Sequence, residues 1–125
     1  MMTKEFEIVF YETVDGQQPV LDFIATLDIK LKAKVFRDLE LLENNGNNLG
    51  MPFSKYLEDG IFELRSKHGS NITRIFYFFV VNKKIIVTNG FRKKTQKTPP
   101  VEIKLAKKYR EDFLAREQDE VGGKK

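Results

Sequence analysis

Residues 75–81 form the most apolar segment of the chain, Ile-Phe-Tyr-Phe-Phe-Val-Val, with a β-branched or aromatic side chain at every position. This run, within a longer candidate strand at residues 72–81, predicts a central β-strand in a sheet covered on one side by helices. Candidate strands at residues 53–57, 61–66 and 84–91 flank it, separated from it and from each other by short breaks. Because parallel neighbours need a long crossover, these breaks can join only antiparallel strands.

Helices are expected before and after these strands in the chain. Residues 5–11 read as an N-terminal strand, Pro19 suits the first turn of a short helix, and Asp28 can cap a longer one. Gly46 suits the C-terminal end of that longer helix, because glycine adopts positive φ without strain. The apolar stripe of the longer helix consists of Leu31, Val35, Leu39 and Leu42. Thr-Pro-Pro at residues 98–100 predicts the start of a C-terminal helix.

This order of elements predicts an α+β fold: an antiparallel sheet of about four to five strands, an N-terminal helical hairpin and a C-terminal helix. A chain of 125 residues can build one hydrophobic core of ordinary size. We assign the single domain to residues 1–118 and expect residues 119–125 to form a flexible tail.

Composition excludes several kinds of chemistry. The chain has no Cys and a single His, His68, so a disulfide framework, a thiolate zinc site, a Cys nucleophile and a multi-His metal site are all excluded. We therefore expect no metal and no cofactor. No apolar run approaches the roughly 20 residues that span a bilayer, so we expect a cytoplasmic protein without membrane contact.

Charge is distributed unevenly along the chain. Residues 1–60 carry 6 Lys or Arg against 11 Asp or Glu, whereas residues 61–125 carry 16 against 7. Such asymmetry indicates either a polyanionic partner for one part of the fold or a dipolar surface without a ligand. Composition alone does not separate these alternatives.

Two arginines lie on adjacent candidate strands. Strand alternation places Glu63 and Arg65 on one face, and Arg74 begins the most apolar strand. A guanidinium there is costly unless it meets a carboxylate, a phosphate or water. The two arginines are therefore candidates for phosphate binding, with a structural bridge from Glu63 to one of them as the alternative.

A basic loop follows the last candidate strand. Phe91 ends that strand, and the loop supplies Arg92, Lys93, Lys94 and Lys97 just before a helix N-terminus, where backbone N–H groups also favour anions. Phe91 is a candidate for stacking on a base, with a core position as the alternative. The helix that follows extends the basic patch, or simply presents a solvated face, through Lys104, Lys107 and Lys108.

Two further residues carry weaker signals. His68 falls in a predicted hairpin loop, and a lone imidazole there is more often an exposed loop residue than a catalyst. Tyr77 falls in the central strand, and its position is more typical of the core than of chemistry. Whether either takes part in the function stays open at this point.

Three motifs together resemble a known family. They are Gly-Ile-Phe-Glu-Leu-Arg at residues 60–65, Thr-Arg-Ile-Phe-Tyr-Phe at residues 73–78 and Gly-Phe-Arg-Lys-Lys-Thr-Gln-Lys-Thr-Pro at residues 90–99. In this order and spacing they resemble the HigB branch of the RelE-like toxins, including phage-derived Gp49-like proteins. The resemblance covers nearly the whole chain, and it departs at Phe62, where Trp is common.

The resemblance implies a toxin of a type II toxin–antitoxin system. Such an enzyme is a ribosome-dependent mRNA endoribonuclease that inhibits translation by metal-free attack of a ribose 2′-OH on the adjacent phosphate. Its partners would be the ribosome, mRNA and a cognate antitoxin, often a helix-turn-helix DNA-binding protein.

Carried onto matching positions, the resemblance implies that Arg65, Arg74, Lys93 and Lys94 are catalytic. Phe91, Arg92 and Lys97 are candidates for RNA binding, together with the lysines at 104, 107 and 108. The alternatives are a non-catalytic nucleic-acid- or protein-binding module, such as a decayed toxin, and a ribonuclease that acts on free RNA.

Overall fold

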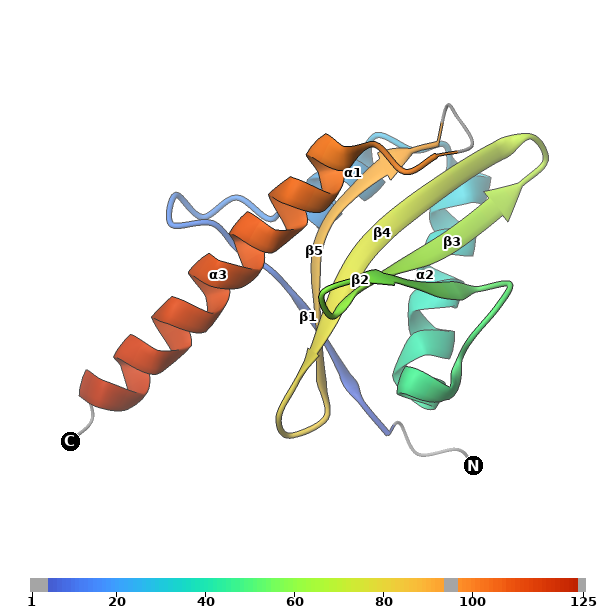
Figure 1. Cartoon of the computed structure of the whole chain (residues 1–125). Helices are drawn as coiled ribbons and strands as arrows, with labels where there is room; N and C mark the ends of the chain where they lie inside the picture. The colour runs from blue at the N-terminus through green and yellow to red at the C-terminus, as the bar shows by residue number, and fades with distance from the viewer. Residues whose placement is uncertain (1–4, 94–96, 124–125) are drawn as a thin grey trace.

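A computed structural model describes residues 5–93 and 97–123 and shows one five-stranded sheet between two layers of helices (Figure 1). The elements in chain order are β1 (Glu7–Phe10), α1 (Pro19–Ala25), α2 (Ile29–Asn45), the short 3₁₀ helix η1 (Gly46–Asn48), β2 (Ser54–Glu58), β3 (Ile61–His68), β4 (Asn71–Val80), β5 (Lys84–Arg92) and α3 (Pro100–Gly123). Helices α1 and α2 cover one face of the sheet and α3 crosses the other. The predicted α+β class is confirmed, whereas the domain boundary at residue 118 stays a prediction.

The strand order is β1-β5-β4-β3-β2. Strands β2 to β5 form an antiparallel meander, as the short breaks predict, but β1 pairs in parallel with β5. The sheet is therefore mostly antiparallel, and β1 at one edge departs from the antiparallel pairing of the other strands. The helices α1 and α2 carry the chain across the sheet to its far edge, and the meander returns to β1 with its last strand pointing the same way.

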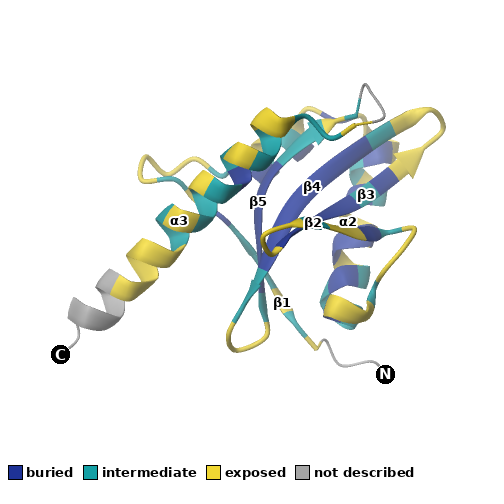
Figure 2. Cartoon of the chain, viewed as in Figure 1, coloured by how far each residue is buried: buried dark blue, intermediate teal, exposed yellow. Residues whose placement is uncertain are grey.

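The central strand β4 is buried on both faces. Ile75 and Tyr77 pack in the cluster beneath α1 and α2, whereas Phe76 and Phe78 pack in the cluster beneath α3. Figure 2 shows the resulting dark band through the middle of the sheet. Helices therefore cover both sides of this strand and not one, which explains why residues 75–78 lack alternation, whereas Val81 lies beyond β4 and is exposed.

Local signals in α2 act as predicted. The side chain of Asp28 accepts a hydrogen bond from the Leu31 N–H at 2.9 Å, which caps the helix. The four residues of the predicted stripe are buried against the sheet.

Helix α3 is attached to the residue that follows β1. There the Tyr11 hydroxyl donates to Asp112 Oδ2 at 2.5 Å, and the Tyr11 ring stacks on Tyr109.

The helix α3 covers only part of its face of the sheet. It begins beyond the end of β5 and runs diagonally away from the β3–β4 hairpin, which extends past it (Figure 1). The sheet surface near that hairpin is consequently left without a helical cover. No helix in the described part of the chain is long and apolar enough to span a membrane.

We predict that Gly46→Ala destabilises the protein by about 3 kcal/mol. Gly46 ends α2 with a φ of 53°, and a Cβ atom there would overlap the ring of Phe6. Gly16→Ala is the matched control, because Gly16 has a φ of 85° but open space around it, so only the backbone penalty of about 1 kcal/mol applies. Urea unfolding of both variants measures the difference, and equal losses would contradict the steric argument.

Candidate functional site

The carboxylate of Glu63 joins the two arginines predicted from the sequence. Arg65 and Arg74 are directly paired across β3 and β4, and Glu63 lies two residues from Arg65, so all three side chains share the α3 face. Glu63 is fully buried and accepts from Arg74 Nη1 at 2.8 and 2.9 Å and from Arg65 Nε at 3.0 Å. The alternative expectation is a structural bridge from Glu63 to one arginine. The bridge is present, and it joins Glu63 to both arginines.

Thr98 closes this network from the segment before α3. Its hydroxyl accepts from Arg74 Nη1 at 2.9 Å and can donate to Glu63 Oε1 at 3.3 Å. The contact attaches the end of the basic loop to the middle of the sheet. The start of α3 and the two arginines are therefore positioned by the same carboxylate.

Arg74 retains unused hydrogen-bonding capacity. Its side chain is only 2% exposed, yet its Nε and Nη2 atoms have no hydrogen-bond partner among the described residues. Buried donors of this kind cost free energy unless an acceptor reaches them. A guanidinium with free donors beside a cavity is suited to bind an oxyanion.

That cavity has a volume of about 340 Å³ and lies on the uncovered part of the sheet. It is lined by Lys34, Pro52, Phe53, Arg65, Lys67, Ile72, Arg74 and Lys93. Five of these side chains are cationic, and the carboxylates that pair with them, Glu63 and Asp38, supply only two negative charges. The pocket therefore has an excess of positive charge and is suited to a phosphate-bearing ligand.

Lys93 enters the pocket from the end of β5. Its backbone N–H donates to the carbonyl of Ile72 at 2.8 Å, which holds this residue beside β4. Partial burial lowers the pKa of the Lys93 ammonium below its usual value, and the charges of Arg74 and Arg65 lower it further. Lys93 thus releases a proton more readily than an ordinary lysine.

Sequence reasoning missed the part of the pocket that Lys34 and Phe53 form. Lys34 of α2 donates to Asp38 Oδ1 at 2.8 Å, and its ammonium lies 5.6 Å from the ring centre of Phe53. Asp38 is fully buried and also accepts from Ser66 Oγ at 2.7 Å. An aspartate within the apolar stripe, four residues after a lysine, is the signal that could have indicated this contact.

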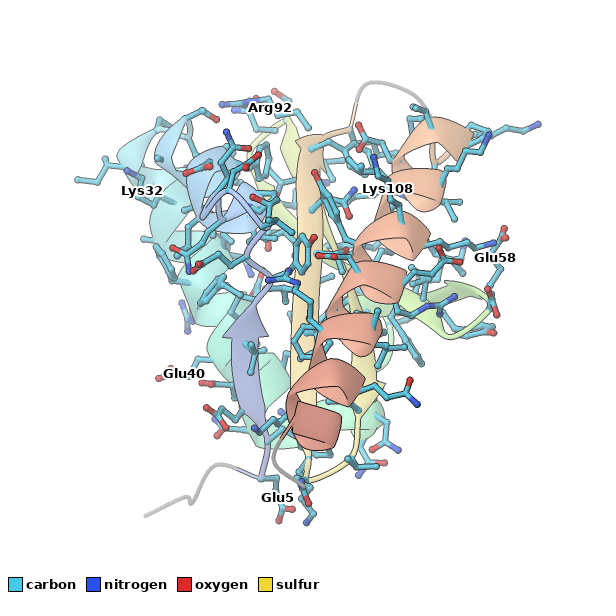
Figure 3. The ribbon with its side chains drawn as sticks, turned by 90° about the vertical axis from the view of Figure 1, so that its left-hand side faces the viewer. Glu5, Lys32, Glu40, Glu58, Arg92 and Lys108 are labelled. Atoms are coloured by element: carbon cyan, nitrogen blue, oxygen red, sulfur yellow. The ribbon has the colours of Figure 1, made fainter. Side chains whose placement is uncertain are left out.

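Phe91 and Arg92 do not line this pocket. Phe91 is half-buried and packs edge-to-face on Phe76 at 5.4 Å, which matches the alternative of a core position. Both residues border a separate groove of about 530 Å³ that also includes Phe23 and Val101. Figure 3 shows Arg92 at the upper end of the sheet, with Glu5 and Glu40 toward the opposite end. The roles of Phe91 and Arg92 in RNA binding stay predictions.

The remaining predicted lysines also lie outside the pocket. Lys97 is exposed just before α3, and Lys104, Lys107 and Lys108 lie on α3 itself. Lys107 pairs with Glu58 of β2 at 2.6 Å, so part of its charge is compensated. Lys94 lies outside the described residues. RNA binding by these side chains, and catalysis by Lys94, remain untested predictions.

His68 and Tyr77 are placed away from the pocket chemistry. His68 is the exposed last residue of β3 and pairs with Asn71, so the predicted loop position is wrong because the strand continues to the two-residue turn. Tyr77 points to the opposite face of the sheet, where its hydroxyl is hydrogen-bonded to Ser54. Burial raises the pKa of Tyr77 to about 12. Tyr77 therefore belongs to the core.

Comparison with known families identifies the family of the chain. The model of the family described as Phage derived protein Gp49-like (DUF891) matches residues 22–111, which include every described residue of the pocket. The chain belongs to this family, which is a toxin-like family of the RelE/HigB type. No curated protein matches the chain significantly. Among the described residues, no group of three or more His, Asp or Glu side chains is placed to hold a metal ion.

We predict that Glu63→Gln destabilises the protein by about 3–5 kcal/mol, because the buried Arg74 loses its compensating charge. Thr98→Val is the control, since it removes a hydrogen bond to the same guanidinium and should cost about 1 kcal/mol. Adding Arg74→Met to Glu63→Gln should recover part of the loss. Urea unfolding measures all three variants, and a Glu63→Gln loss no larger than that of Thr98→Val would contradict the proposed pairing.

Proposed function

We propose that this chain is the toxin of a toxin–antitoxin pair and acts as a ribosome-dependent mRNA endoribonuclease. Membership of a toxin-like family supports the general class. The observation that carries the enzymatic proposal is the pocket with excess positive charge, which is lined by the buried Arg74, a residue whose Nε and Nη2 donors have no hydrogen-bond partner among the described residues. Such a pocket is suited to a phosphate that gains negative charge during reaction.

In this proposal the ribose 2′-OH of the bound RNA attacks the adjacent phosphorus. The new P–O2′ bond forms as the P–O5′ bond breaks, which leaves a 2′,3′-cyclic phosphate and a 5′-hydroxyl. Arg74 and Arg65 would bind the non-bridging oxygens and stabilise the charge that develops on them. Glu63 would act as a positioning residue, because it touches both guanidinium groups from beneath.

Lys93, which lines the pocket, would help with proton transfer. Its pKa is already lowered by its surroundings, so its ammonium can protonate the departing 5′-oxygen more readily than an ordinary lysine can. Tyr77 is on the other face of the sheet and His68 is at the exposed end of β3. The group that removes the 2′-OH proton would then come from outside the described pocket, for example from the ribosome.

The partners in this proposal are the ribosome, mRNA and a cognate antitoxin, all in the cytoplasm. A helix-turn-helix antitoxin encoded beside this gene would support the assignment. The absence of any small DNA-binding protein there would weaken it.

We predict that Lys93→Ala and Arg65→Gln each lower the rate of mRNA cleavage by about 100-fold or more, because each removes a cation from the developing charge. Lys32→Ala is the matched control, since Lys32 projects away from the sheet on α2 (Figure 3). Growth after induction and mapping of new 5′ ends on translated transcripts measure the effect. Folded variants that remain fully toxic would overturn the assigned site.

The same measurements separate the alternative functions. Cleavage of purified RNA without ribosomes would favour a ribonuclease that acts on free RNA. Salt-sensitive RNA binding without any new 5′ ends would favour a non-catalytic binding module.

A further inference from the structure

We infer that the pocket contains a nucleobase subsite, with the ring of Phe53 as its stacking surface and Lys34 as a hydrogen-bond donor to the edge of the base. The inference rests on the proposed function, because it assumes that a nucleotide phosphate occupies the arginine side of the same pocket. It assigns a role to two residues that the motifs do not include.

The pocket has two chemically different walls. Arg65, Arg74 and Lys93 form a cationic wall, whereas Pro52 and Phe53 form an apolar wall next to Arg65. Ile72 lies instead beside Lys93. A bare phosphate would use only the first wall. A nucleotide has a charged end and a flat apolar end, so it can use both walls at once.

A backbone hydrogen bond fixes the position of Phe53. It immediately precedes β2, and its carbonyl accepts from the Arg65 N–H at 2.7 Å. The aromatic residue is therefore tied through the backbone to a residue of the cationic wall. Its side chain is only partly buried and lines the cavity, which leaves ring surface available to a base.

Lys34 is also held in place. Its ammonium donates to Asp38 and lies over Phe53, and Asp38 is itself fixed by Ser66 of β3. Because Asp38 balances its charge, Lys34 adds little to the general attraction for phosphate. An ammonium has three donors, so it can offer another to a carbonyl oxygen or ring nitrogen of a base beside Phe53.

The experiment compares ribose 5-phosphate with GMP and UMP, which add a base to the same sugar phosphate. Binding to the intact protein is measured by NMR titration at low salt. We expect the nucleotides to bind about tenfold more tightly than ribose 5-phosphate, as expected for one stacked base. Phe53→Leu, which keeps an apolar side chain, and Lys34→Met should each reduce this ratio substantially. Lys32→Met is the matched control on α2 and should leave the ratio unchanged.

The outcomes distinguish this inference from the proposed function. If ribose 5-phosphate binds and the nucleotides bind no more tightly, the base subsite is overturned while the phosphate site stands. The same conclusion follows if folded Phe53→Leu and Lys34→Met proteins keep the full tenfold ratio. If neither ribose 5-phosphate nor a nucleotide binds, the phosphate pocket of the proposed function is overturned as well.

Discussion

The candidate site depends on the ion pairs and hydrogen bonds of the buried Glu63 carboxylate. Burial of a charge is costly, and here two guanidinium groups and the Thr98 hydroxyl surround it with hydrogen bonds. The arrangement also requires the correct pairing of β3 with β4. A slip of one residue would move Arg74 to the α2 face and leave Glu63 buried without that partner. The network therefore links strand register, the start of α3 and the chemistry of the pocket.

The uneven charge of the chain is only partly reflected in space. Glu5 and Glu40, from the acidic half, lie toward the end of the sheet opposite Arg92, in line with separation of the two signs. Asp38 comes from the same acidic half, yet it holds Lys34 at the edge of the basic pocket. Carboxylates thus serve two purposes here. Surface carboxylates such as Glu58 pair with cations of α3, whereas those in the core position cations that face the cavity.

Much of the fold could be predicted because its signals are local. Helical spacing, the cap at Asp28 and the short breaks between strands indicate the elements, and strand alternation alone places Glu63 beside Arg65. The parallel pairing of β1 with β5 depends instead on how the chain crosses the sheet. Lys34 lies outside the predicted apolar stripe of α2, and its contact with Phe53 exists only after α2 packs on β3. Phe91 is the opposite case: the sequence makes it a candidate for base stacking, but its ring packs on Phe76 and does not line the pocket.

The position of the site on regular strands has a consequence for how it can work. Arg65 and Arg74 extend from paired strands, and their guanidinium groups are already aligned by Glu63 before any ligand arrives. In the proposed function, a phosphate would meet guanidinium groups that Glu63 already holds in place, which is the condition under which fixed charges stabilise a transition state most effectively. The unpaired donors of Arg74 are a cost to the empty protein, and an entering oxyanion would remove that cost. In the proposed function, the same feature that weakens the fold locally would favour the bound state.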